Sequence, residues 1–351
     1  MKQKRFAIPT RFLLVLFFLL AGTGIASRAA ASLPAQLTDE QFWKLSTELS
    51  EPDGNFRSDN LLSNELWFQY IIPELTSAAK AGRVYMGVGP EQNFTYIAAL
   101  KPKMAFIVDI RRGNLDLHLM YKALFELSKD RAEFVGLLFS RQRPESLSAT
   151  SSVKEIFDAY AKVEANEEAF KQNLKNIVGH LAKKHGFGLS DDDVRGVEYV
   201  YRNFFRYGPS ITYSSSGSGF GGGSFVPYYS LMIADDGAGV LRSYLANEEN
   251  FGFIKDLETR NMIVPVIGDF AGPKAIRAVG KYLKENDGMV SAFYLSNVEQ
   301  YLSGVWNNFC ANVATLPLDD SSTFIRSVRG NGGLNSQLGH MLPEVQGCVA
   351  R

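Results

Sequence analysis

Side chains that bind metals or form disulfides are scarce in this chain, which has two cysteines and four histidines among 351 residues. No Cys-x-x-Cys pair occurs, and the histidines lack the spacing of a ligand set. The sequence therefore predicts no metal site. The two cysteines, Cys310 and Cys348, either pair in an oxidising compartment or are unrelated buried thiols, and we expect them to pair.

An excess of charge of one sign is also absent. The chain has 37 basic and 37 acidic side chains, so its formal net charge is zero. Proteins that bind nucleic acids usually have a basic excess, and we therefore expect no nucleic-acid partner. The hydrophobic fraction of 46% is sufficient for a large core. The composition leaves the oligomeric state open.

The N-terminus carries an apolar run that is short for a membrane span. Four basic residues within the first eleven precede an apolar run over residues 12–26, and Ala29-Ala30-Ala31 offers a cleavage site. A spanning helix needs about 20 apolar residues, so residues 1–31 are predicted to be a signal peptide, with an uncleaved anchor as the alternative. We expect an exported protein, periplasmic or secreted, or one held at the membrane by this segment.

Residues 32–351 are predicted to form a single α/β domain. Short apolar segments suited to strands alternate with segments of helical periodicity. The predicted strands lie at 84–88, 105–110, 262–269, 290–296 and 323–327. This alternation predicts a doubly wound, mostly parallel sheet with helices on both faces.

The region 128–260 interrupts this alternation and is predicted to be mainly helical. It contains a stretch rich in glycine and serine at 214–224, which we interpret as a flexible surface loop rather than a mobile lid. The aromatic residues between Tyr199 and Tyr207 are expected to pack a helix onto the core rather than to line a substrate pocket.

A glycine turn follows the first predicted strand. Gly87 and Gly89 lack a Cβ atom, so backbone there can approach a ligand closely. Asp109 ends the next strand 20 positions after Gly89, about where a carboxylate accepts hydrogen bonds from ribose hydroxyls. The order strand, glycine turn, helix, strand and acid predicts a pocket for a nucleoside-type ligand.

These residues resemble the motifs of the class I S-adenosylmethionine-dependent methyltransferases. Gly87-Val88-Gly89 is similar to the glycine turn of that family, and Asp109 to the acid that holds the ribose. The resemblance implies that Asp269 meets the adenine amino group and that Asn297 lies beside the methyl donor. It also implies that 128–260 is a large helical insertion between the family's second helix and third strand.

A second likeness covers the residues around these motifs. The segments Gly-Val-Gly-Pro-Glu-Gln-Asn-Phe-Thr-Tyr, Val-Asp-Ile-Arg-Arg and Tyr-Leu-Ser-Asn-Val-Glu resemble those of a family of bacterial proteins. That likeness implies no particular reaction. Gln92 and Asn93, which follow the glycine turn, are further candidate contacts of the cofactor, and the alternative is that they cap the next helix.

Two positions depart from the methyltransferase pattern. Tyr85 stands where that family has an acid, and Glu91 stands in place of its third glycine. Simpler roles also exist for the candidate residues. Asp109 could pair with Arg111 or Arg112, and side chains such as Asp269 and Asn297 are suited to capping helices.

Two functions follow from these observations. The first is a methyltransferase that uses S-adenosylmethionine on an unspecified small molecule. The second is an exported protein without enzymatic activity that uses the same cleft for a nucleoside-like or other polar ligand, or for a protein partner. The expected export of the protein favours the second function, because S-adenosylmethionine is made in the cytosol. The ordered series Asp109, Asp269 and Asn297 favours the first.

Overall fold

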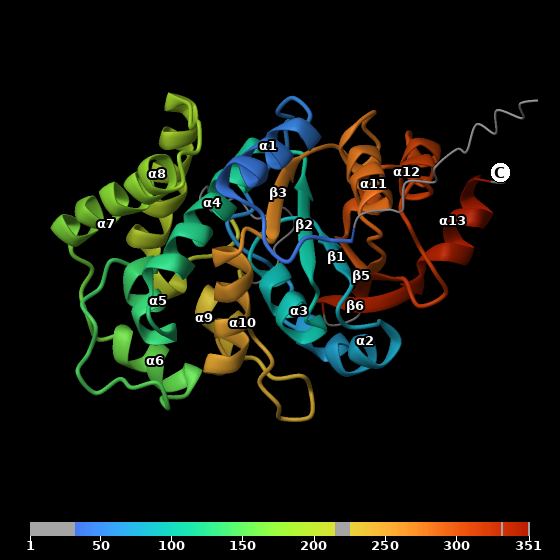
Figure 1. The fold of residues 1–351 in the computed structure, drawn as a ribbon. Coiled ribbons are helices and arrows are strands. Elements are labelled where there is room, and N and C mark those ends of the chain that lie inside the picture. Colours follow the sequence, from blue (N-terminus) through green and yellow to red (C-terminus); the bar gives the residue numbers. More distant parts are fainter. Residues whose placement is uncertain (1–31, 215–224, 331–332, 350–351) are drawn as a thin grey trace, which may run out of the picture.

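The apolar segments form one six-stranded sheet in the computed structural model, which describes residues 32–214, 225–330 and 333–349 (Figure 1). The strand order is β3-β2-β1-β4-β5-β6. Strands β1 to β5 run parallel, and β6 is antiparallel to β5. The strands are β1 (Val84–Gly87), β2 (Met104–Asp109), β3 (Ile263–Ile267), β4 (Val290–Ser296), β5 (Thr323–Gly330) and β6 (Gly333–His340).

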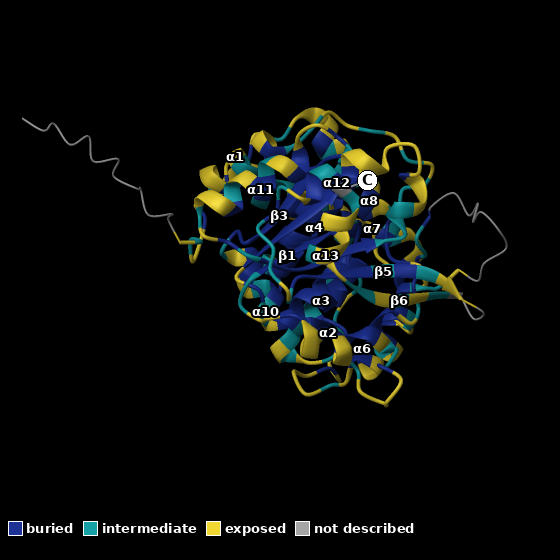
Figure 2. Cartoon of the chain, turned by 90° about the vertical axis from the view of Figure 1, so that its right-hand side faces the viewer, coloured by how far each residue is buried: buried dark blue, intermediate teal, exposed yellow. Residues whose placement is uncertain are grey.

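Helices cover both faces of this sheet. On one face lie α1 (Asp39–Leu49), α11 (Ala275–Glu285) and α12 (Trp306–Val313), and on the other lie α3 (Gln92–Leu100) and α4 (Arg112–Leu127). Every residue of β1, β2 and β3 is buried, because both faces are covered. Figure 2 shows the central strands in dark blue inside helices whose outer sides are yellow, whereas the projecting ends of β5 and β6 are teal and yellow. The prediction of a mostly parallel α/β sheet is therefore confirmed.

Between α4 and β3 the chain forms the predicted series of helices. They are α5 (Arg131–Leu138), α6 (Val153–Tyr160), α7 (Glu167–Gly179), the π-helical turn η2 (His180–Lys184), α8 (Asp191–Tyr207), α9 (Tyr228–Ile233) and α10 (Glu248–Thr259). Helix α8 packs against α4, and α10 packs against α3 and α4. Two of the aromatic residues of α8, Tyr201 and Phe204, are buried in the core as expected.

Two helices of the fold begin with reciprocal capping hydrogen bonds. Thr38 and Gln41 form a reciprocal capping box at α1, and Ser190 with Asp193 forms one at α8. The predicted signal peptide and all but the first residue of the loop 214–224 lie outside the described residues. Within residues 32–214, 225–330 and 333–349, no helix is both long and apolar enough to cross a membrane.

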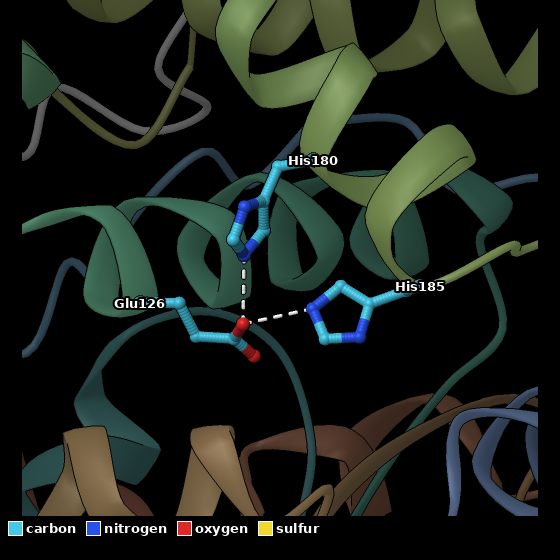
Figure 3. A group of neighbouring side chains, drawn as sticks. All are labelled: Glu126, His180 and His185. Atoms are coloured by element: carbon cyan, nitrogen blue, oxygen red, sulfur yellow. Dashed lines mark hydrogen bonds and ion pairs between the residues drawn. The ribbon is translucent and has the colours of Figure 1, made fainter.

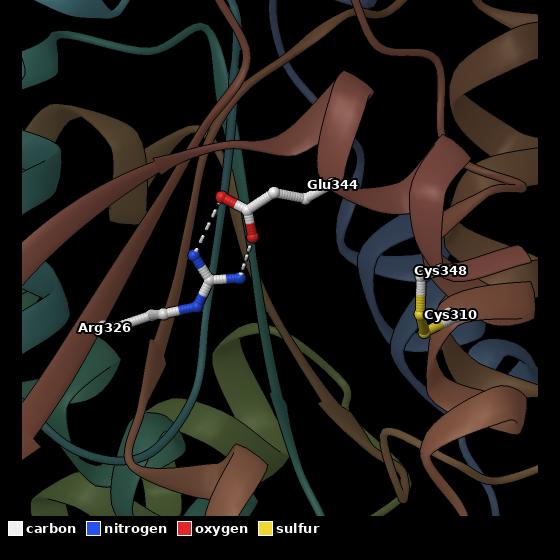
Figure 4. Close-up of a disulfide and its surroundings, with 4 residues drawn as sticks. All are labelled: Cys310, Arg326, Glu344 and Cys348. Carbon is white, nitrogen blue, oxygen red and sulfur yellow. Dashed lines mark hydrogen bonds and ion pairs between the residues drawn. A yellow bond between two sulfur atoms is a disulfide. The ribbon is translucent and has the colours of Figure 1, made fainter. Parts of the chain in front are cut away.

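The C-terminal part differs most from the sequence prediction. Asn297 is followed by a short 3-10 turn, Val298–Tyr301, and α12 begins only at Trp306. The fifth strand is longer than predicted and turns back as β6, after which α13 (Met341–Val349) packs on α12. Cys310 of α12 and Cys348 of α13 form the predicted disulfide, with their Cα atoms 5.9 Å apart (Figure 4).

Candidate functional site

A pocket of about 430 Å³ lies at the carboxyl ends of the parallel strands. Four of the seven predicted contacts line it, namely Gly89, Asp109, Asp269 and Asn297. The register explains this convergence. Asp109 pairs with Ile267 at the end of β3, and Gly87 pairs with Tyr294 near the end of β4. Strand ends at one edge of an open α/β sheet are the usual position of a ligand crevice.

The glycine turn forms one wall of the pocket. Gly89 has a φ of +77°, which residues with a Cβ rarely adopt, and a Cβ built there would point into open space. Gly87 does not line the pocket. A Cβ at Gly87 would collide with Oδ1 of Asn93 and with the ring of Tyr85. The two glycines are therefore needed for different reasons: Gly87 for close packing and Gly89 for its backbone conformation.

Gln92 and Asn93 support the turn from behind and do not line the pocket. The Asn93 side-chain amide donates to the carbonyl oxygens of Val88 at 2.9 Å and Pro90 at 2.7 Å. Gln92 is buried, and its amide donates to Oε2 of Glu65 at 3.0 Å. Both residues are thus one layer removed from any ligand in this pocket.

Asp109 is buried at the end of β2 and forms the local ion pair that was the alternative to ribose binding. Its Oδ1 accepts from the backbone N–H of Arg111 at 2.9 Å and from Nε of Arg111 at 3.1 Å, and its Oδ2 accepts from the same guanidinium at 3.0 Å. Arg111 also donates to the carbonyl of Asp59. The carboxylate is therefore held in a fixed orientation, and Oδ2 keeps free capacity to accept a hydrogen bond.

Asp269 and Asn297 lie in the connections that follow β3 and β4. Oδ1 of Asp269 accepts from the N–H of Ala271 at 2.9 Å and so stabilises the turn before α11. Glu51, rather than Asp269, accepts from the first N–H groups of α11, Lys274 and Ala275. The side chain of Asn297 caps no helix. Both residues remain available to the pocket.

The sequence analysis missed an acid in the pocket, Glu65. Its side chain is buried, and Oε1 accepts from the hydroxyls of Tyr294 at 2.8 Å and Ser296 at 2.6 Å. No lysine or arginine of the described chain forms an ion pair with it. Ser296 has a φ of +49°, a strained conformation that often marks functional sites. The pocket therefore contains a carboxylate that accepts hydrogen bonds and, within the described part of the chain, has no lysine or arginine as its ion-pair partner.

The two departures from the methyltransferase pattern are both buried outside the pocket. Tyr85 donates its hydroxyl to Oδ1 of Asn93 at 2.8 Å and does not line the pocket. Glu91 accepts from the N–H of Ser63 at 3.3 Å, and burial raises its pKa to about 8. Neither residue can meet a ligand without rearrangement of the turn.

Residues far from the motifs complete the walls. Arg57 comes from the segment before η1 (Phe68–Ile71), and Arg329 comes from β5. Phe56 and Tyr301 meet edge to face, with ring centroids 5.3 Å apart, and Tyr301 is half exposed. Sequence reasoning missed these residues because they lie in irregular segments or near a hairpin that has no motif of its own.

A second cluster brings together three residues that the sequence spacing does not group as metal ligands. Glu126, His180 and His185 present one ligand atom each within 4.8 Å of one another. Glu126 lies in the last turn of α4, which starts at the pocket edge and runs for about 24 Å. The cluster therefore lies at the amino ends of the strands, whereas the pocket lies at their carboxyl ends.

Comparison with known proteins gives one family. A family model described as "Domain of unknown function (DUF7790)" matches residues 60–344. This match includes the glycine turn, all five parallel strands and most of the pocket wall. No curated protein matches the chain.

Proposed function

The chain belongs to the family described as "Domain of unknown function (DUF7790)", and from the geometry of its pocket we propose that it binds S-adenosylmethionine as a methyltransferase-like protein. The observation that supports this proposal best is the pocket itself, where Asp109, Asp269 and Asn297 meet Glu65. A ligand that joins a nucleoside to an ammonium group matches this distribution of polar groups.

Glu65 is the proposed partner of the ligand's ammonium group. The acid that methyltransferases usually carry before the glycine turn is Tyr85 here, and Tyr85 faces Asn93 instead of the pocket. Glu65 supplies a carboxylate to the pocket from the N-terminal segment. Its acceptor oxygens are oriented by Tyr294, Ser296 and Gln92, so a cation would find a preorganised partner.

The nucleoside end of the ligand is assigned to Asp109 and Asp269. Asp109 is fixed by Arg111, so its remaining acceptor capacity points in one direction. Asp269 follows β3 next to it, since the N–H of Gly268 donates to the carbonyl of Asp109 at 2.8 Å. Methyl transfer needs no protein nucleophile, and orientation of donor and acceptor supplies much of the rate. The helices 128–260 are then an insertion into the methyltransferase fold.

Calorimetric titration of the chain from residue 32 onward tests this proposal. S-adenosylmethionine and S-adenosylhomocysteine are expected to bind at one site. Glu65→Gln should weaken both by about 10-fold or more, because a charge-assisted hydrogen bond is lost. Methylthioadenosine, which lacks the amino group, should bind wild type and Glu65→Gln alike. The exposed Glu145→Gln is the matched control.

Failure of a folded wild-type chain to bind any of these ligands at millimolar concentration would reject the proposal. The alternative function, an exported protein that binds another polar ligand without chemistry, would then be the better account. That alternative is favoured by one observation, the presence of Arg329 in the pocket wall, because a cationic side chain suits an anionic ligand.

A further inference from the structure

The cluster at the far edge of the sheet joins two separate parts of the chain (Figure 3). Glu126 comes from the C-terminal turn of α4, and His180 and His185 flank the π-helical turn η2. The side chains of these residues are 3%, 10% and 5% exposed. Two imidazoles with little exposed surface that converge on one such carboxylate need an explanation beyond surface ion pairing.

The π-helical turn is what brings the histidines together. The N–H of His185 donates to the carbonyl of His180 at 3.1 Å, which is an i to i+5 hydrogen bond. Residues five apart therefore lie on one side of the turn. Nε2 of His180 lies 2.7 Å and Nε2 of His185 lies 2.8 Å from the same oxygen, Oε2 of Glu126. Single-turn π-helices occur frequently at functional sites.

His185 lies between two carboxylates. Its Nδ1 is 2.7 Å from Oδ1 of Asp39, and Asn261 donates to the same oxygen at 2.9 Å. A neutral imidazole has one N–H and can donate to only one of these acids. A carboxylate on Nδ1 of a histidine whose Nε2 faces other ligand atoms is the arrangement that orients metal-bound histidines.

We propose that Glu126, His180 and His185 bind a divalent transition-metal cation, with Asp39 orienting His185 from outside the coordination shell. Two imidazoles and one carboxylate are a donor set suited to Zn²⁺, with water in the fourth position. The metal takes the place of the two Nε2 protons, so each histidine binds it through a lone pair. Lys122, 2.8 Å from Oε1 of Glu126, leaves Oε2 for the metal.

Lys184 is the group that the metal displaces. Its Nζ lies 3.1 Å from Oε2 of Glu126 and 3.4 Å from Nε2 of His180, so an ammonium now neutralises the ligand atoms. The Lys184 side chain is 59% exposed and can turn to solvent without loss of packing. A surface hollow of about 380 Å³, lined by Asp39, Trp43, His185 and Gly186, opens beside His185.

At this position a bound metal would link three elements of the fold. The cluster ties the start of α1 to the end of α4 and to η2, at the edge away from the pocket. A metal bound to the native state alone raises the free energy of unfolding by mass action. The site is separate from the proposed ligand pocket, so it stands or falls independently of the proposed function.

Titration of the metal-free chain with ZnCl₂ tests this proposal. One Zn²⁺ per chain should bind, and the melting temperature should rise with Zn²⁺ and fall again with a chelator. His180→Gln and His185→Gln should each weaken binding at least 100-fold, and Asp39→Asn by about 10–100-fold. His340→Gln, an exposed histidine on β6, is the matched control and should leave binding unchanged.

Lys184→Met and Lys183→Met form a second matched pair, since both lysines are exposed in the same turn. The first should tighten Zn²⁺ binding about fivefold or more, and the second should not. Nitrogen NMR of the wild-type chain needs no variant: Zn²⁺ should shift the Nε2 signals of His180 and His185. Absence of stoichiometric Zn²⁺ binding, or Nε2 signals that do not move, would overturn the proposal.

Discussion

Glu91 shows how one residue can set the pH dependence of stability. Its side chain is fully buried beneath the glycine turn, and burial raises its pKa to about 8 from an ordinary value of 4.5. A carboxyl whose pKa is higher in the folded state stabilises the fold below its unfolded pKa. That contribution is lost as pH rises through the folded pKa.

Glu91→Gln should therefore remove the part of the fall in the free energy of unfolding with rising pH that Glu91 causes. Wild-type stability is expected to fall by roughly 3–4 kcal/mol more than that of the variant between pH 5 and pH 8. Urea unfolding at the two pH values measures the difference. Glu145→Gln, at an exposed site, should behave as wild type. Parallel pH dependence in wild type and Glu91→Gln would show that Glu91 is ionised in the fold.

Alanine substitutions at two glycines of the same region are expected to change stability in opposite directions. Gly87→Ala places a Cβ against Asn93 and Tyr85, so we expect a loss of about 2 kcal/mol or more in the free energy of unfolding. Gly113 lies exposed in the first turn of α4 with no atom within 4 Å of a Cβ. Gly113→Ala should stabilise by up to about 1 kcal/mol. Equal effects of the two changes would contradict the packing described for the turn.

At the scale of elements, the C-terminal hairpin and α13 are held by one covalent and one ionic link. The disulfide Cys310–Cys348 joins α12 to α13, and Arg326 of β5 donates to Glu344 of α13 at 2.6 Å (Figure 4). Arg326 also donates to Glu299 at 2.8 Å. Together these links fix the last helix to α12 and β5.

Loss of the disulfide should destabilise the chain by about 2–4 kcal/mol, because the unfolded state is no longer constrained by a loop of this size. The measurement is guanidinium unfolding with and without a reductant. The double variant Cys310→Ser, Cys348→Ser should match the reduced wild type and show no response to reductant. Identical unfolding curves for the oxidised and reduced wild type would mean that α13 is held by its other contacts.

The elements differ in how well sequence alone predicts them. Strands β1 to β4 were predictable because each is a short, fully buried apolar run. Strand β6 was not, since its glycines, polar residues and single leucines give a weak pattern and its partner β5 supplies the pairing. The π-helical turn at His180 also escapes prediction, because hydrophobic periodicity detects α-helices and not one wider turn.

The candidate pocket was predictable only at the strand ends. Asp109, Asp269 and Asn297 follow strands whose carboxyl ends must meet at one edge. Glu65 and Arg57 lie in a segment with little regular structure, and tertiary contacts such as the hydrogen bond from Leu61 N–H to the Tyr213 carbonyl place it. No local rule connects such a segment to a strand end more than 20 residues away.

For the molecule as a whole, stability should be greatest in mild acid. Burial raises the pKa of Asp116 and Glu258 to about 8, as it does for Glu91, so all three lose their contribution as pH rises from about 4.5 to 8. Burial lowers the pKa of His118 to about 4, so its contribution is lost as pH falls below about 6.5. Hydrogen bonds from Arg83 hold the pKa of Asp319 well below its usual range, and that contribution is lost in stronger acid.

Three raised carboxyl groups outweigh one lowered histidine between about pH 4.5 and 6.5. The melting temperature is therefore expected to be highest at about pH 4 to 4.5 and to decline toward pH 8. Calorimetric scans from pH 4 to pH 9 measure this profile. A melting temperature that rises from pH 5 to pH 8 would contradict the assignment of these groups as protonated in the fold.

The long helical segment between β2 and β3 also determines when the sheet can assemble during synthesis. Ala105 of β2 pairs with Ile263 of β3, about 160 positions later in the chain. A ribosome that adds 5–20 residues per second needs roughly 8–30 s to supply that partner. During this interval β1 and β2 are complete, but the outer edge of β2 has no neighbour. Such an unpaired strand is a binding site for chaperones and for other nascent chains. The yield of folded protein therefore depends on what binds the open side of β2 before the last third of the chain has been synthesised.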